Sequence, residues 1–207
     1  MEVAVLTKSS KFGNYCVAGI NLASGEFVRL VTEDDTIHGA LTFRDIMYED
    51  GSCMQEMDIV KVEIKGRDNN LLQPENVVID RDYYLDKAGT FSISELVDIC
   101  PNSIGRTIFG NTGCYVHESD IESVGKSLTL IRVSDFVVHQ RINAEGRPKA
   151  KASFNYNGYI YDNMPITDPN YYGAENGTEV DDAILVVSIG SPYGDKHYKF
   201  VAAVYEI

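Results

Sequence analysis

The chain has 207 residues, of which 44% are hydrophobic, and its formal net charge is −13. This length fits one large domain or two small ones, and the apolar content excludes a disordered chain. The acidic charge excludes a strong general DNA binder, because neutralising phosphates needs a positive footprint, which here must be local.

Strand patterns dominate the first half of the chain. Short β-rich runs cover residues 3–8, 15–21 and 26–32, and turn-forming residues with glycine lie just ahead of the second and third runs. A further run over residues 57–65 alternates between apolar and charged side chains. These runs predict a three-stranded meander followed by a fourth strand.

A helix pattern and then further strands follow. Ser92 and Glu95 form a capping box. It predicts a short helix from about residue 93 to about residue 100, which Pro101 stops. Strand patterns return over residues 127–138, 150–156, 159–161, 182–188 and 198–207.

This order of elements indicates a mainly β fold. Two tandem OB-like five-stranded barrels, with a short helix in the connecting region, fit it best. We expect the boundary near Gly125. The first barrel and the helix-bearing connector then cover residues 1–125, and the second barrel covers residues 126–207. A single larger β-barrel or sandwich is the alternative.

Cysteine and histidine usage favours neither a metal site nor secretion. The 4 cysteines and 4 histidines are scattered, without the close spacing of zinc ligands. No apolar run approaches the roughly 18 to 20 residues of a membrane helix. The N-terminus lacks the basic and long apolar regions of a signal peptide. We therefore expect reduced thiols, no metal or other cofactor, no membrane partner and a cytoplasmic location.

Seven short motifs occur in an order that resembles a known family. They are residues 6–11 (LTKSSK), 16–20 (CVAGI), 27–31 (FVRLV), 73–76 (QPEN), 166–169 (ITDP), 188–190 (SIG) and 198–203 (YKFVAA). Together they resemble the dual OB-containing domain family of small bacterial proteins over nearly the whole chain. The resemblance implies two OB folds and a ligand-binding or nucleic-acid-binding role, without a settled chemistry. The family often has Trp where this chain has Val28 and Val77, so no stacking role is expected there.

The first candidate site follows the first predicted strand. Lys8, Ser9, Ser10 and Lys11 are expected in a loop, where OB folds bind ligands. Two ammonium groups and two hydroxyls there would hold a phosphate. The alternative is a polar turn with solvated lysines.

Further polar candidates lie in the first barrel. Arg29 stands between apolar neighbours, where its guanidinium would bind a phosphate or a carboxylate. Gln73, Glu75 and Asn76 surround a proline, and the amides of Gln73 and Asn76 suit recognition of a base edge. The alternatives are a structural ion pair between Arg29 and Glu75 and an ordinary loop.

One basic cluster stands out in the second barrel. Arg141, Arg147, Lys149 and Lys151 fall within a short stretch, and Lys149 and Lys151 share one strand face. Tyr156 would add base stacking, which contributes on the order of 1–3 kcal/mol per base. The alternative is a solvated edge strand, whose lysines discourage aggregation.

The remaining candidates lie near the end of the chain. Thr167 and Asp168 precede a proline and would either bind a ligand or fix a turn. Lys199 lies in the last strand pattern. Cys16 lies inside a predicted strand, which is typical of a small core residue rather than of a nucleophile.

These observations lead to three hypotheses of function. The first is a dual OB binding module for a nucleotide or a short single-stranded nucleic acid. The second is an acidic protein–protein interaction module without nucleic-acid binding. The third is an enzyme acting on a nucleotide-like small substrate, with Asp168 and Lys199 in its site, although no catalytic triad is found.

Overall fold

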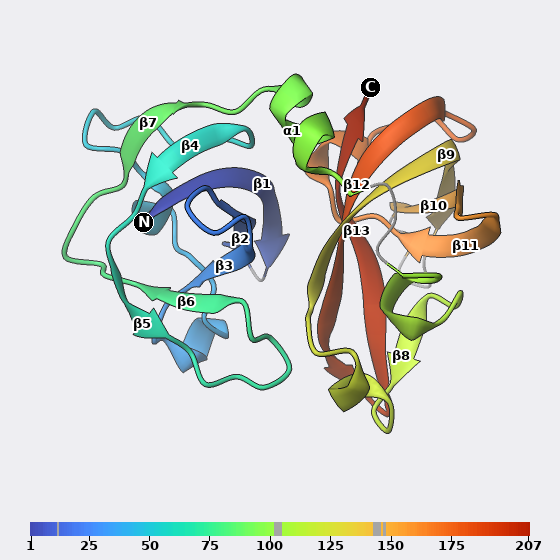
Figure 1. Ribbon diagram of the computed structural model, residues 1–207, viewed down its shortest axis with the longest axis horizontal. Helices are drawn as coiled ribbons and strands as arrows, with labels where there is room; N and C mark the ends of the chain where they lie inside the picture. The colour runs from blue at the N-terminus through green and yellow to red at the C-terminus, as the bar shows by residue number, and fades with distance from the viewer. Residues whose placement is uncertain (12, 102–104, 143–145, 147) are drawn as a thin grey trace. The chain divides into compact units, whose positions relative to one another are not determined.

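The computed structural model describes residues 1–11, 13–101, 105–142, 146 and 148–207 (Figure 1). They form two compact units, Met1–Leu96 and Val97–Ile207. Each unit is built on one curled sheet, so the prediction of a mainly β chain is confirmed. Within the described ranges, none of the helices has the length and apolar character needed to cross a membrane.

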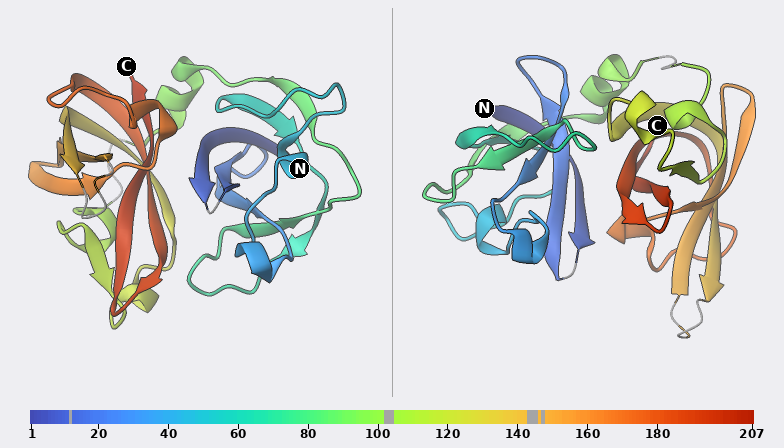
Figure 2. Two further views of the ribbon diagram at one scale, coloured as in Figure 1. Left: turned by 180° about the vertical axis from the view of Figure 1, so that it is seen from behind. Right: turned by 90° about the horizontal axis from the view of Figure 1, so that it is seen from below.

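The first unit holds a 7-stranded sheet. Its strands are β1 (Glu2–Lys11), β2 (Asn14–Asn21), β3 (Phe27–Val31), β4 (Asp58–Lys61), β5 (Ile64–Arg67), β6 (Asn76–Ile79) and β7 (Asp86–Thr90). They lie in the order β5-β6-β3-β2-β1-β4-β7, with β3 and β6 parallel. Only Val62 and Glu63 separate β4 from β5 along the chain, so the strand next to one edge of the sheet leads directly into the strand at the other edge. Figure 2 shows the curled sheet from two further sides.

Alternation along these strands places one face of the sheet in the core. Val17, Leu30 and Val77 are register partners across β2, β3 and β6, and each is at most 1% exposed. Because successive side chains of a strand point to opposite faces, the neighbours of these residues point away from the core. β-branched and aliphatic side chains suit a pleated surface that is buried on one side, which explains the strand runs of the sequence.

The second unit holds a 6-stranded sheet. Its strands are β8 (Tyr115–His117), β9 (Leu128–Ile142), β10 (Pro148–Tyr156), β11 (Tyr159–Pro165), β12 (Glu179–Tyr193) and β13 (Lys196–Glu206). They lie in the order β11-β10-β9-β12-β13-β8. A parallel bridge between Ile166 and Val201 joins the end of β11 to β13, so this sheet also curls toward closure.

The helical segments are short. The α-helix α1 (Ile93–Ile99) has the predicted capping box: the Ser92 amide donates to Glu95 Oε2 at 2.7 Å, and the Glu95 amide donates to Ser92 Oγ at 3.2 Å. The 3-10 helices are η1 (Asp35–Ile37), η2 (Arg44–Ile46), η3 (Ile108–Gly110), η4 (Ile121–Ser123) and η5 (Pro169–Tyr171).

The segment before residue 125 packs with the second sheet, whereas we expected a division near Gly125. β8 pairs with β13, with His117 opposite Lys196. The Ile108 amide donates to Tyr161 Oη at 2.8 Å. The two units therefore divide at Leu96 and Val97.

Candidate ligand-binding site

Four strands of the first unit carry a row of side chains that point away from the core. Thr7 is opposite Ala18, Ala18 is opposite Arg29, and Arg29 is opposite Asn76. Register partners share a face of the sheet, and residues two apart on one strand do too. Cys16, Ala18, Arg29 and Asn76 therefore lie on one face, which we call the Arg29 face.

Arg29 is held in place by its backbone, but part of its guanidinium has no partner. Its amide donates to the Glu75 carbonyl at 2.9 Å. The Nη1 atom is buried and makes no hydrogen bond. Burial lowers the pKa of Arg29, while Glu75 and then Cys16 act to raise it. Glu75 attracts the guanidinium, but Nη1 has no hydrogen-bond partner.

Asn76, the register partner of Arg29, carries an unpaired acceptor. The residue is 3% exposed, and its Nδ2 donates to Asp68 Oδ2 at 3.0 Å and to Gln73 Oε1 at 3.5 Å. Its Oδ1 atom is buried without a partner. Leaving a buried polar group unsatisfied costs about 1–3 kcal/mol, and such groups in folded proteins need an explanation. A ligand that supplies an acceptor to Arg29 and a donor to Asn76 provides one.

Lys8, Ser10 and Lys11 lie in a strand and not in the loop that we expected, because β1 continues to Lys11. Lys8 Nζ donates to the Met54 carbonyl at 2.8 Å and to Gln55 Oε1 at 2.7 Å, so its ammonium anchors another segment. Ser10 is exposed opposite Tyr15. The side chain of Lys11 lies outside the described residues.

The basic cluster of the second unit lies at the β9–β10 hairpin. Arg141 is opposite Lys149, so the two exposed side chains share a face, and Lys151 points to the same side as Lys149. Arg147 lies outside the described residues. Tyr156 is 2% exposed and points to the other face of β10, where alternation places it in the core. The expected stacking of Tyr156 beside these cations is therefore wrong.

Thr167, Asp168 and Lys199 serve the fold of the second unit. The Thr167 amide donates to the Val201 carbonyl at 2.8 Å. Asp168 caps η5 by accepting from the Asn170 amide at 2.9 Å, and it also accepts from the Val204 amide at 2.9 Å.

Lys199 is fully buried. Its Nζ donates to the Ile108 carbonyl at 2.7 Å and to the O and Oδ1 atoms of Asn111 at 2.8 and 2.9 Å. All three acceptors lie in the segment around η3. Lys199 thus fastens this segment to β13, which differs from the ligand contact that we expected.

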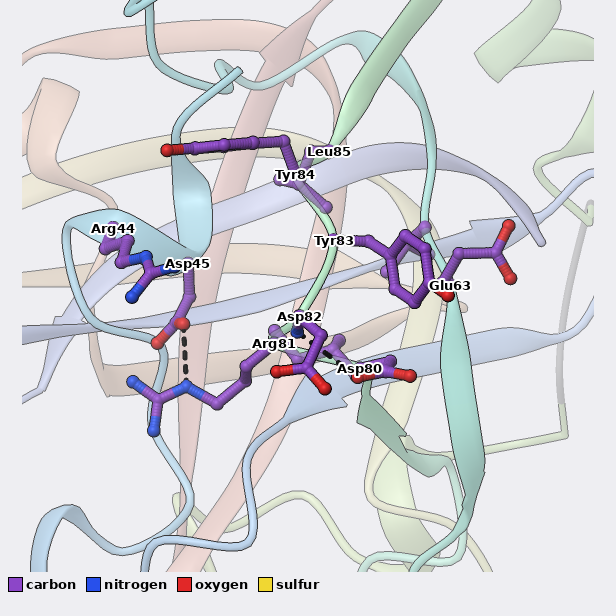
Figure 3. Close-up of a pocket in the computed structure, with 11 residues that line it drawn as sticks. Arg44, Asp45, Glu63, Asp80, Arg81, Asp82, Tyr83, Tyr84 and Leu85 are labelled. Carbon is purple, nitrogen blue, oxygen red and sulfur yellow. Dashed lines mark hydrogen bonds and ion pairs between the residues drawn. The ribbon is translucent and has the colours of Figure 1, made fainter. Parts of the chain in front are cut away.

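A pocket of the first unit was missed by the sequence analysis (Figure 3). Arg81 Nε donates to the buried Asp45 Oδ1 at 2.8 Å across it. Its volume of about 20 Å³ has room for about one water. An adjoining groove of about 710 Å³ shares Tyr83 and Tyr84 with it, and these rings are 63% and 51% exposed. The only sequence signal was two adjacent tyrosines among charges, outside any strand pattern.

Metal chemistry finds no support among the residues that the structure describes. No group of three or more His, Cys, Asp or Glu side chains among them is arranged to hold an ion. None of the 4 cysteines, all of which the structure describes, forms a disulfide.

The two curled sheets define a tandem OB-fold protein. A family model for the dual OB-containing domain matches residues 1–204. The chain belongs to this family, which confirms the predicted resemblance and the two OB-like barrels. No curated protein matches the chain. The crystal structure of the tetrameric p202 HIN2 is similar at 10% identity over 99% of this chain and 89% of that chain, with a TM-score of 0.33.

Proposed function

We propose that the first unit binds a nucleotide, or one nucleotide of a short single strand, on the Arg29 face. The observation that carries this proposal is the pair of buried and unpaired atoms, Nη1 of Arg29 and Oδ1 of Asn76. They belong to register partners on adjacent strands. A donor beside an acceptor complements the edge of a nucleobase, on which an acceptor stands beside a donor.

The position of this pair in the barrel supports the same ligand class. OB folds bind oligonucleotides on the face of their second and third strands, between the first hairpin loop and the loop before the last strand. Arg29 lies on β3, and Gln73 and Glu75 lie in the loop before β6. The net charge of −13 favours a single nucleotide or a short segment over a long polymer, since every further phosphate meets repulsion.

The test is calorimetric titration of a panel of nucleotides at low salt into wild-type protein, Arg29→Met and Arg67→Met. Met fills a similar volume and removes the unpaired donor. Arg67 lies on β5, is solvent-exposed and pairs with Glu26 at 3.8 Å, so it is a matched control for the loss of one charge. We expect Arg29→Met to weaken binding at least tenfold and Arg67→Met to leave it nearly unchanged. Absence of binding to wild-type protein, or equal binding by Arg29→Met, would refute the proposal.

The groove beside Tyr83 and Tyr84 favours a second candidate, a protein-interaction surface. Its charged lining residues are the carboxylates of Glu49, Asp50, Asp82 and Asp86 and the ammonium of Lys87. Lys87 Nζ pairs with the buried Asp58 at 2.5 Å, which leaves the carboxylates in excess. Exposed tyrosines and carboxylates together suit a segment bearing Lys or Arg.

Replacement of both tyrosines by alanine tests this candidate. The probe is a labelled peptide that alternates arginine and glycine, and binding is read by fluorescence anisotropy at physiological salt. We expect Tyr83→Ala/Tyr84→Ala to weaken it, while Tyr193→Ala, at a ring 80% exposed in the second unit, does not. Equal binding by all three proteins would show attraction to net charge alone and would exclude the groove.

A further inference from the structure

The second unit has a pocket of its own beside the segment around η3, which we call the η3 pocket. Its volume is about 260 Å³, the space of about nine waters, so it suits a molecule with a single ring system. Residues of the η3 segment, of the end of η4 and of strands β9 and β10 line it. Its lining includes Thr107, Phe109, Ser123, Lys126, Thr129 and Ile131.

The strand residues of the η3 pocket belong to the buried face of β9. Thr129 and Ile131 are two apart on this strand, opposite Val187 and Leu185 of β12. The three aliphatic residues are at most 1% exposed, and Thr129 is 4% exposed. The Thr129 hydroxyl has no hydrogen-bond partner among the described residues. A buried polar group without a partner needs an explanation, and an acceptor on a ligand in the pocket provides one.

Polar contacts fix the wall of the pocket that η3 forms. The Gly105 carbonyl accepts from Asn157 Nδ2 at 2.9 Å. Further along the segment, the Ile108 amide donates to Tyr161 Oη at 2.8 Å, and the Ile108 carbonyl accepts from Lys199 Nζ at 2.7 Å. A wall that is held in place before binding spares a ligand the cost of ordering it.

Phe109 lines the same wall from a strained backbone. Its φ of 51° and ψ of 42° lie in the left-handed region, which is uncommon for a bulky side chain. The residue is 6% exposed, so its ring is turned away from solvent. Strain of this kind persists where the surroundings hold it, and it clusters at ligand sites. Together with Ile131, Phe109 gives the pocket an apolar lining that suits a ring.

The charge of the lining selects against cations. The chain carries a net charge of −13, but Lys126 is the only charged residue among the described residues that line this pocket. An ammonium group only donates hydrogen bonds, and the hydroxyls of Thr107, Ser123 and Thr129 add further donors. The lining therefore favours a ligand group that accepts hydrogen bonds.

We propose that the η3 pocket binds a small aromatic molecule whose polar group is a hydrogen-bond acceptor, as in an aromatic carboxylate. The ring occupies the apolar part of the pocket beside Phe109 and Ile131, and the acceptor faces Thr129 and Lys126. This site lies in the second unit, and nucleotide binding on the Arg29 face belongs to the first, so either proposal stands or fails without the other.

The experiment records proton–nitrogen correlation spectra of the full folded chain during titration with benzoate and, separately, with benzylammonium. Ligands of this size bind with a dissociation constant on the order of 1 mM, so both are added to millimolar concentration. We expect benzoate to shift the amide signals of Phe109, Gly110 and Thr129, and benzylammonium to leave them in place. The proposal is overturned if benzoate shifts none of these signals, or if benzylammonium shifts them equally. Shifts confined to the β9–β10 hairpin would show an anion attracted to exposed cations and would overturn it too.

Thr129→Val tests the hydroxyl, because valine has nearly the same shape. Loss of one hydrogen bond should weaken benzoate binding about fivefold. Thr90→Val is the matched control, since Thr90 is an exposed strand threonine of the first unit, and it should leave the affinity unchanged. An unchanged affinity in Thr129→Val would overturn the proposed contact.

Lys126→Glu keeps the proposal testable if Thr129→Val fails to fold. The reversed charge should weaken benzoate binding at least about tenfold, because an attraction becomes a repulsion, and benzylammonium should now shift the signals of the pocket. Lys61→Glu, at an exposed lysine of the first unit, changes the net charge equally and should alter neither titration. A Lys126→Glu protein that binds benzoate as wild-type protein does would overturn the assignment of the ligand class.

Discussion

Arg29 in the first unit and Lys199 in the second are both basic side chains in strands, but their surroundings differ. Lys199 is fully buried, and its ammonium donates to three oxygens of one segment. Arg29 keeps a buried donor without any partner. A buried cation whose donors all have partners within the protein stabilises the fold. A buried cation with an unpaired donor is arranged for a partner that is not part of the fold.

The largest expected effect is the loss of stability when Lys199 is replaced. Lys199→Met removes one donor each from the Ile108 carbonyl and from both oxygens of Asn111. Losing the hydrogen bonds of a charged donor to buried oxygens costs roughly 1.5–3 kcal/mol. We expect urea unfolding of the second unit to shift by about this amount, with the first unit unchanged. A loss below about 1 kcal/mol would show that the hydrogen bonds of Lys199 do not hold the segment around η3 in place.

The next effect concerns pH. Burial lowers the pKa of Lys199 to about 8 from an ordinary value of 10.5. Between these values the unfolded chain binds more protons than the folded unit, so this residue makes the unfolding free energy rise with pH. The rise is on the order of 2 kcal/mol between pH 8 and pH 10.5. Lys199→Met should remove this slope, as measured by urea unfolding across the range.

Much of the fold is readable from the sequence because alternation and turn residues are local signals. The runs over residues 3–8 and 150–156 correspond to β1 and β10, and the capping box marks α1. β7 and β8 were not predicted. β7 has the polar sequence DKAGT, and β8 has three residues, so long-range pairing with β4 and β13 forms them rather than any pattern of their own.

The site is readable only in part, for a physical reason. Arg29, Glu75 and Asn76 were each candidates, but only the parallel pairing of β3 with β6 brings them together. Parallel pairs join segments that lie far apart in the chain, so no local pattern reports them. Lysine is a residue type that often binds ligands, and only the buried acceptors of Lys199 show that it serves the fold.

The third effect concerns the stability of the first unit when Arg29 is replaced. Arg29→Met removes a donor that has no partner, so the folded state loses no hydrogen bond of Nη1. We expect the unfolding free energy to stay the same or to rise by up to about 1 kcal/mol, while nucleotide binding is weakened at least about tenfold. Thermal unfolding without ligand measures this. A loss above about 2 kcal/mol would mean that the guanidinium is structural, like the ammonium of Lys199.

The smallest effect on stability belongs to the exposed cations of the β9–β10 hairpin. Arg141 and Lys149 are register partners at its end, and Lys151 points to the same side. At physiological salt the screening length is about 8 Å, so distant carboxylates of this acidic chain are largely invisible to a ligand that touches the hairpin. Weak binding of a single-stranded oligonucleotide should therefore be detectable at low salt and fall steeply as salt rises.

Charge reversal tests the hairpin. Lys149→Glu/Lys151→Glu should abolish the low-salt binding of a labelled oligonucleotide and leave the melting temperature nearly unchanged, because Lys149 is exposed and Lys151 lies on the face of β10 turned away from the core. Lys61→Glu/Lys65→Glu, at two half-exposed lysines of the first unit, is the matched control for net charge. If both variants weaken binding equally, the oligonucleotide senses only the overall charge. If wild-type protein binds none at low salt, the hairpin has no nucleic-acid role, and the groove beside Tyr83 and Tyr84 becomes the surface to pursue.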